Sequence, residues 1–255
     1  MKPITTTLAR VAALGAGLAL CAGAAFSQDK GSYLLRPGEW GDGVGSYLLP
    51  GDLRDAELSQ WPLDGWYRVT HREGALKVSA VPQVRPVLPA FLQEIAVQGR
   101  PGVAKPTARP EAMAEAIDTQ YIRVPGIKLV EGMQPSVKFS KGVLRPRLDH
   151  DYQLVLGETA FTLRVQNGLR NKDGKPFGEG ALYTIGYGGE SYSYLLGEQG
   201  WDSVLQAVSD IDGDGKPDFL IQVNGHHGAA EFLLLSRQAR PGRNAPSAAL
   251  AWQGC

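Results

Sequence analysis

Apolar and polar residues alternate along much of the chain with the period of two that is typical of half-buried β-strands. Residues 66–71 and 75–81 form two such runs around a glycine, which predicts a β-hairpin. Residues 152–156 and 160–165 repeat this arrangement. Because turn signals separate the predicted strands at intervals of about 8–12 residues, we expect a mainly β protein, either an antiparallel sandwich or a barrel-like fold.

Proline and repeat patterns divide the rest of the chain. The sequence Gly-Ser-Tyr-Leu-Leu occurs at residues 31–35 and again at 45–49, and two copies predict a pair of short strands, since a repeat array needs at least three. Prolines gather in residues 82–110, where they remove backbone donors that a central strand needs.

We expect a boundary between two regions at the end of this proline-rich stretch, followed by the one helix predicted in the mature chain. Residues 110–117 begin with a proline and continue with Ala, Glu and Met, which is the composition of a short helix. We therefore expect a β-rich region over residues 28–106 and a second β-rich region over 107–255. The alternative is a single domain that contains both.

The composition favours a globular, turn-rich protein and excludes several function classes. Of 255 residues 43% are hydrophobic, so wholesale disorder is excluded, and the 32 glycines and 17 prolines are typical of a protein with many turns. Lys and Arg number 26, as do Asp and Glu. A dedicated nucleic-acid binder usually has an excess of basic residues. Because the charges balance here, we expect no nucleic-acid partner.

The first 27 residues have the features of an export signal. The positive charges Lys2 and Arg10 precede an apolar run over residues 11–23, which is too short to span a membrane, and small residues follow it. We expect cleavage of this signal peptide and a periplasmic or secreted protein without a membrane span. Lipidation of Cys21 is the alternative. Ordinary cleavage leaves only Cys255, which cannot form an internal disulfide.

Residues 210–218 carry the most specific chemical signal in the chain. They read Asp-Ile-Asp-Gly-Asp-Gly-Lys-Pro-Asp, so carboxylates stand at positions 1, 3, 5 and 9 of a loop, and a glycine allows a sharp turn at position 6. Hard oxygen ligands in this number and spacing suit Ca²⁺. The expected ligands are Asp210, Asp212, Asp214, the carbonyl of Lys216, and Asp218.

The surroundings of this loop distinguish it from an EF-hand. Position 12 is Ile221, where an EF-hand has a bidentate Glu, and both flanks are apolar and strand-like. A calcium loop between two strands resembles the FG-GAP repeats of integrin α-subunit propellers and related bacterial extracellular proteins. The resemblance covers roughly residues 201–236 and implies the same five ligands. Only one unit is present, so a multi-bladed propeller is not implied. The C-terminal tail also resembles the end of a group of uncharacterised exported bacterial proteins.

Three weaker signals admit both functional and structural interpretations. His226 and His227 stand side by side in a predicted turn, and Asp149, His150 and Asp151 place a base between two acids just before a strand. A segment over residues 183–201 is rich in tyrosine and glycine. Its rings predict either a surface that contacts sugars or a partner protein, or strand residues packed on the core.

These observations lead to a limited functional expectation. We expect an exported calcium-binding β protein that acts as a binding or interaction module, with a protein or a glycan as partner. The alternative is a cell-envelope hydrolase with catalytic groups near His150 or His226. No recognisable catalytic motif supports it.

Overall fold

The chain is seen in a computed structural model that describes residues 31–40, 44–48, 62, 64–72, 74–81, 119–168, 180–197, 200–225 and 228–253. The predicted signal peptide (1–27), the predicted helix (110–117) and His226 and His227 lie outside these residues. Within the described part the chain is mainly β, as predicted, and its one helix is a 3-10 turn, η2 (Ser236–Gln238). No described helix has the length and hydropathy needed to cross a membrane.

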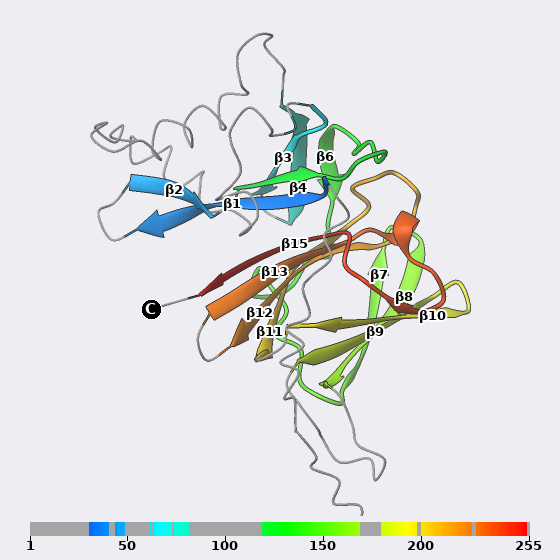
Figure 1. Ribbon diagram of the computed structural model, residues 1–255. Helices are drawn as coiled ribbons and strands as arrows, with labels where there is room; N and C mark the ends of the chain where they lie inside the picture. Colours follow the sequence, from blue (N-terminus) through cyan, green and yellow to red (C-terminus); the bar gives the residue numbers. More distant parts are fainter. Residues whose placement is uncertain are drawn as a thin grey trace, which may run out of the picture.

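The strands form three sheets (Figure 1). The six-stranded sheet has the order β2 (Val44–Leu48), β1 (Tyr33–Trp40), β5 (Thr119–Arg123), β3 (Tyr67–Arg72), β4 (Ala75–Ala80) and β6 (Gly132–Pro135). The five-stranded sheet has the order β14 (Gly242–Asn244), β10 (Glu190–Leu196), β9 (Ala181–Tyr187), β8 (Thr159–Asn167) and β7 (Asp151–Leu156). The four-stranded sheet has the order β11 (Gly200–Ser209), β12 (Asp218–Gly225), β13 (Gly228–Leu234) and β15 (Ala248–Gln253).

Strand pairing confirms the hairpins read from the sequence. The first predicted hairpin is β3–β4 and the second is β7–β8, each pairing in antiparallel register. The two Gly-Ser-Tyr-Leu-Leu copies lie at β1 and β2, which also pair with one another. All pairs are antiparallel except β10 with β14, and none of the sheets closes into a barrel. The barrel-like alternative is therefore wrong, and the sheets pack face to face instead.

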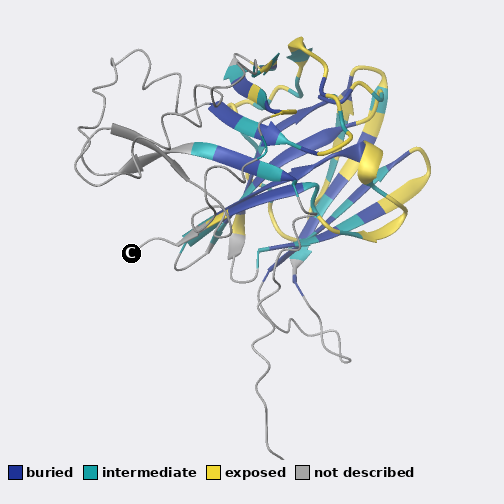
Figure 2. Cartoon of the chain, turned by 45° about the horizontal axis from the view of Figure 1, so that its top comes forward, coloured by how far each residue is buried: buried dark blue, intermediate teal, exposed yellow. Residues whose placement is uncertain are grey.

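The four-stranded sheet is the central layer, with one of the other sheets on each face. From β12, Phe219, Ile221 and Val223 pack into the hydrophobic core shared with the five-stranded sheet, whereas Leu220 packs into the core shared with the six-stranded sheet. A strand buried on both faces favours apolar residues at consecutive positions, as in residues 219–221 of β12 and 232–234 of β13. Figure 2 shows this layer buried along most of its length.

The outer sheets keep the alternation of half-buried strands. In β9, buried and partly exposed residues alternate along the whole strand, and Tyr183 and Ile185 point into the core. Strands from both predicted regions share the six-stranded sheet, because β5 pairs with β1 and with β3. This arrangement places the connection between β11 and β12 at one end of the central layer, next to η2 (Figure 1).

Candidate metal centre

The predicted cation loop, residues 210–218, connects β11 to β12, so its strand-like flanks are confirmed. Its backbone turns through two glycines with positive φ, Gly213 (75°) and Gly215 (80°). Neighbouring elements hold the loop from outside. The Val130 amide donates to the Ile211 carbonyl at 2.8 Å, and Thr159 Oγ1 of β8 donates to the Gly215 carbonyl at 3.0 Å.

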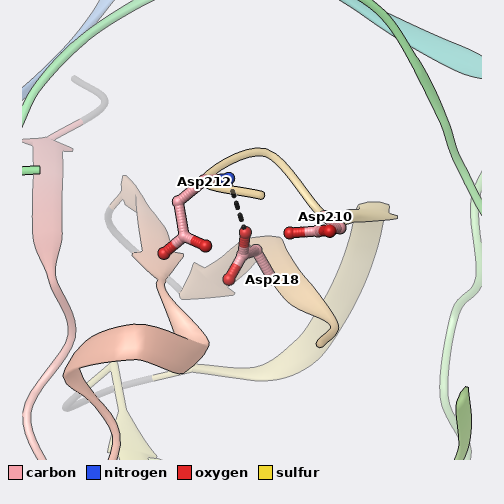
Figure 3. Close-up of side chains that lie close together, drawn as sticks. All are labelled: Asp210, Asp212 and Asp218. Atoms are coloured by element: carbon pink, nitrogen blue, oxygen red, sulfur yellow. Dashed lines mark hydrogen bonds between the residues drawn. The ribbon is translucent and has the colours of Figure 1, made fainter. Parts of the chain in front are cut away.

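Three of the predicted ligands meet inside this loop. Asp210, Asp212 and Asp218 each have a carboxylate oxygen within 4.8 Å of those of the other two (Figure 3). Asp212 and Asp218 are buried, with 4% and 2% of their surface exposed, and Asp210 is partly exposed. Within the described part of the chain this is the only group of three or more acidic, histidine or cysteine side chains close enough to share one ion.

Burial and mutual repulsion make the negative charge of these groups costly. Burial raises the pKa of the Asp212 carboxyl above its usual range, and the charge of Asp214 raises it further. The pKa of Asp218 is raised well above its usual range, first by burial and then by the charge of Asp212. A bound cation would reverse both effects, because it favours the charged form of every carboxylate around it.

Loop amides orient the three carboxylates. Asp218 Oδ2 accepts hydrogen bonds from the amides of Ile211 (2.8 Å) and Asp212 (3.3 Å). Asp210 accepts from the amides of Asp214 (3.0 Å) and Gly215 (2.9 Å). Asp212 Oδ1 accepts from the Asp214 amide at 3.2 Å. Each ionised carboxylate oxygen has two lone pairs, so the oxygens of Asp210, with one hydrogen bond each, keep acceptor capacity for an ion, whereas Asp218 Oδ2 already accepts two hydrogen bonds.

One carboxylate oxygen of the group lacks a hydrogen bond. Asp212 Oδ2 is buried without a hydrogen-bond donor, although it forms an ion pair with Arg237 Nε at 3.5 Å. Leaving such an acceptor without a donor costs about 1–3 kcal/mol, and more when it is charged. A cation or a hydrogen-bond donor next to this oxygen would therefore stabilise the fold.

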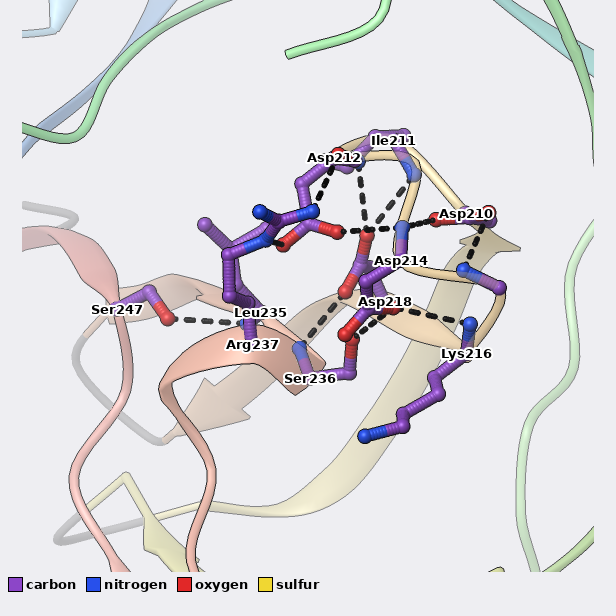
Figure 4. Close-up of polar contacts among 11 residues, drawn as sticks. Asp210, Ile211, Asp212, Asp214, Lys216, Asp218, Leu235, Ser236, Arg237 and Ser247 are labelled. Carbon is purple, nitrogen blue, oxygen red and sulfur yellow. Dashed lines mark hydrogen bonds and ion pairs between the residues drawn. The ribbon is translucent and has the colours of Figure 1, made fainter. Parts of the chain in front are cut away.

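The other two predicted ligands stand in different positions. The Asp214 carboxylate accepts hydrogen bonds from Ser236 Oγ at 2.8 Å and from the Lys216 amide at 2.9 Å, and it does not belong to the group of three. Lys216 is exposed, and Figure 4 shows its side chain extending away from the carboxylates. Within the loop, the backbone amide of Lys216 forms the hydrogen bond to Asp214.

Two residues of the site were missed by sequence reasoning because they come from beyond β13. The Ser236 amide donates to Asp218 Oδ1 at 2.8 Å, while its hydroxyl binds Asp214. Arg237 Nη2 donates to the Asp212 carbonyl at 3.1 Å, besides its ion pair with that side chain (Figure 4). Both lie in η2, and nothing in the local sequence places this short turn against the loop.

Two of the three weaker sequence signals fall on described residues, whereas His226 and His227 lie outside them. Tyr183, Tyr187, Tyr192 and Tyr194 are all buried, so these tyrosines belong to the core and the interpretation of their rings as an exposed binding surface is wrong. His150 packs edge-to-face on Tyr152, with ring centroids 4.6 Å apart. Asp151 instead pairs with Arg164 at the surface, at 3.1 Å.

Comparison with known proteins adds no assignment. No protein-family profile matches the chain, and neither curated proteins nor solved structures contain a match. The FG-GAP resemblance of residues 201–236 therefore stays a prediction, and the geometry of the loop carries the functional argument.

Proposed function

We propose that residues 210–218 bind Ca²⁺, and that the ion stabilises the fold of an exported binding or interaction module. The observation that carries this proposal is the buried, hydrogen-bond-free Oδ2 of Asp212, in a side chain whose carboxylate lies within 4.8 Å of those of Asp210 and Asp218. A divalent cation supplies the missing partner of this oxygen and removes the repulsion between the three charges.

The donor set supports calcium among the common cations. The three clustered side chains offer only carboxylate oxygen, whereas zinc prefers histidine nitrogen and cysteine sulfur. Magnesium requires a small octahedral shell and keeps several waters, but a nine-residue loop with many oxygens suits the larger and more flexible shell of calcium. Asp214 and the Lys216 carbonyl are the further oxygens of the expected ligand set.

The position of the loop supports a structural role. Its ligands come from the connection between two strands of the central layer, and hydrogen bonds already join that connection to η2 through Ser236 and Arg237. The expected mature chain has one cysteine, Cys255, and so lacks the disulfides that stabilise many exported proteins. An ion held at 100 times its Kd adds about 2.7 kcal/mol to the free energy of unfolding.

Thermal unfolding in chelator and in increasing Ca²⁺ tests this proposal. We expect saturating Ca²⁺ to raise the melting temperature by about 6–10 °C, from the conversion of about 2–4 °C per kcal/mol for a chain of this size. Asp218→Asn should abolish the rise. Asp202→Asn, in which the charge removed belongs to an exposed pair with Arg145, should retain it.

Terbium luminescence provides a second readout that does not depend on stability. Burial is the main cause of the raised pKa values of Tyr187 and Tyr194, and the charges of Asp214 and Asp218 respectively add to it. These two rings are therefore the expected sensitisers of a bound Tb³⁺. We expect tyrosine-excited emission that Ca²⁺ displaces and Mg²⁺ does not. The absence of both a melting shift and Tb³⁺ emission in the unsubstituted protein would contradict the proposal.

A further inference from the structure

A second site candidate is a cleft of about 540 Å³ beside β11, formed by residues 36, 71, 74–76, 120, 136–139, 142–143 and 206–207. Its volume falls within the range of about 300–1,000 Å³ that is usual for small-molecule sites. None of these residues belongs to the cation loop. The cleft is therefore a distinct feature of the molecule.

The backbone around β11 explains why this cleft exists. Residues 136–144 run along β11 and bond to it at two points: the Val137 amide donates to the Val208 carbonyl at 2.9 Å, and the Leu144 amide donates to the Leu205 carbonyl at 3.1 Å. Between these points the chain turns away from the strand, with the Gly142 amide donating to the Phe139 carbonyl at 3.0 Å. The register of β11 shifts between Leu205 and Ala207, opposite this turn.

The charged residues of the cleft all belong to basic types. Arg36, His71 and Lys138 line it, and none of the acidic residues that the structure describes does. Glu231 lies beneath, 1% exposed, and binds Arg36 Nη1 through Oε1 at 2.7 Å. This bond holds the guanidinium in place, and its remaining N–H groups make no hydrogen bond with the described part of the chain. A carboxylate, like a phosphate, matches such a donor edge, and the apolar residues of the lining favour an organic carboxylate.

Lys138 is held over the same cleft without an anionic partner. A Cβ added at Gly74 would lie 3.1 Å from Lys138 Cγ, so the stem of Lys138 lies directly against the Gly74 backbone. Among the described residues none forms an ion pair with its ammonium group. Lys138 therefore adds a positive charge that remains available to a ligand.

The lining of the cleft also includes apolar residues. Val143 is half-buried in it and the buried Leu76 lies among the lining residues, whereas Val137 and Phe139 line it and also pack against the core shared with the five-stranded sheet. Two polar residues of the lining bond to each other, since Gln120 Nε2 donates to Gln206 Oε1 at 3.1 Å. A ligand with only polar groups would leave the apolar part of the lining without contacts, whereas an apolar body attached to a charged group fits both parts.

We infer that this cleft binds a small organic carboxylate with an apolar body, the carboxylate contacting Arg36 and Lys138 and the body contacting the apolar part of the lining beside Val143. The site is independent of the cation loop. It provides the proposed binding module with a small-molecule specificity that its sequence alone does not indicate.

Saturation-transfer NMR with three small probes tests this inference on the purified protein. Phenylacetate carries both features, 2-phenylethanol carries only the apolar body, and acetate carries only the charge. We expect phenylacetate to bind with a Kd of about 1 mM, as is usual for a ligand of this size, and the other two to bind at least about tenfold more weakly. Equal binding of 2-phenylethanol or of acetate would overturn the inference, as would no binding of phenylacetate.

Three variants locate the bound probe. Lys138→Gln should raise the Kd for phenylacetate about three- to fivefold, and Arg36→Lys, which keeps the charge but removes the planar donor edge, about tenfold. Lys141→Gln removes another exposed charge three residues along the same segment but outside the lining, and should leave the Kd unchanged. Equal weakening by Lys138→Gln and Lys141→Gln would overturn the site, because it would show a general effect of surface charge.

Discussion

Asp212 is the residue of the cation loop whose negative charge is the least well compensated. Its side chain is fully buried, one oxygen lacks a hydrogen bond, and two further carboxylates are close by. A buried charge of this kind is expensive unless it is paired, and Arg237 approaches it only at 3.5 Å from a half-exposed position. Asp212 should therefore affect stability in opposite directions with and without the ion.

The first prediction concerns this change of sign. Burial and the charge of Asp214 raise the pKa of Asp212, so at neutral pH without a cation its charged form disfavours the fold. Asp212→Asn keeps the shape and removes the charge, so in chelator its melting temperature should match or exceed that of the unsubstituted protein by up to about 3 °C. In saturating Ca²⁺ the order should reverse. Scanning calorimetry of both proteins measures this, and lower stability of the variant in chelator would contradict it.

The second prediction concerns Tyr183, which is buried in the core between the central and five-stranded sheets. Burial raises the pKa of its hydroxyl above the ordinary value. A raised folded pKa means that stability is fully present below the unfolded pKa of about 10 and is lost as pH rises beyond it. Tyr183→Phe should therefore lose less stability than the unsubstituted protein between pH 9 and about pH 11.

Urea unfolding at a series of pH values tests this expectation. The difference in unfolding free energy between Tyr183→Phe and the unsubstituted protein should be constant up to about pH 9 and then shift in favour of the variant. Tyr152→Phe is the matched control, since Tyr152 lies on β7 and is only partly buried. Parallel curves for all three proteins would show that Tyr183 does not contribute to alkaline unfolding.

The connection between β11 and β12 depends on two glycines with the same backbone conformation but different surroundings. Gly213 and Gly215 both have positive φ. A Cβ at Gly213 would lie 2.5 Å from Val130 Cγ2, whereas a Cβ at Gly215 has no atom within 4 Å. This pair separates the conformational cost of the loop from the cost of packing it against the segment before β6.

The third prediction uses this matched pair. Gly215→Ala should lower the free energy of unfolding by about 1–2 kcal/mol, the cost of a side chain in the left-handed region. Gly213→Ala should lose about 1–3 kcal/mol more, because the new methyl group overlaps Val130. Adding Val130→Ala to Gly213→Ala should recover most of that difference. Equal losses for the two glycine variants, measured in urea, would contradict the observed packing of the loop.

At the level of the whole molecule, an ion pair joins two layers. Arg36 on β1 of the six-stranded sheet binds Glu231 on β13 of the central sheet, across 195 positions of sequence. Gln206 Nε2 of β11 also donates to Glu231 Oε1, at 2.9 Å. A buried carboxylate between sheets must keep its partners, because an unpaired charge there is strongly destabilising.

The fourth prediction is a double-mutant cycle on this pair. Arg36→Met leaves the buried charge of Glu231 without its ion-pair partner and should lower the unfolding free energy by about 3–5 kcal/mol. Glu231→Met should also be destabilising, and the double variant should lose clearly less than the sum of the two, with a coupling of about 1–3 kcal/mol. Urea denaturation of the four proteins gives the coupling. Additive losses would show that the pair does not join the layers energetically.

The predictable part of the fold is its local part. Alternation placed the β3–β4 and β7–β8 hairpins correctly, because a half-buried strand imposes a period of two and a turn residue lies between its partners. The apolar runs in β12 and β13 predicted strands but not their depth. Their burial on both faces depends on two further sheets, and one of these includes β1, which lies early in the chain.

The cation loop shows the same division most clearly. The Asp and Gly spacing of residues 210–218 specifies a tight turn lined with carboxylates, because the ligands and the flexible positions are neighbours in sequence. The grouping of Asp210, Asp212 and Asp218 without Asp214, the approach of Ser236 and Arg237, and the separate cleft beside β11 arise from packing between distant segments. Local chemistry is encoded by adjacent residues, whereas burial, electrostatic environment and cavities depend on contacts that form only when the three layers assemble.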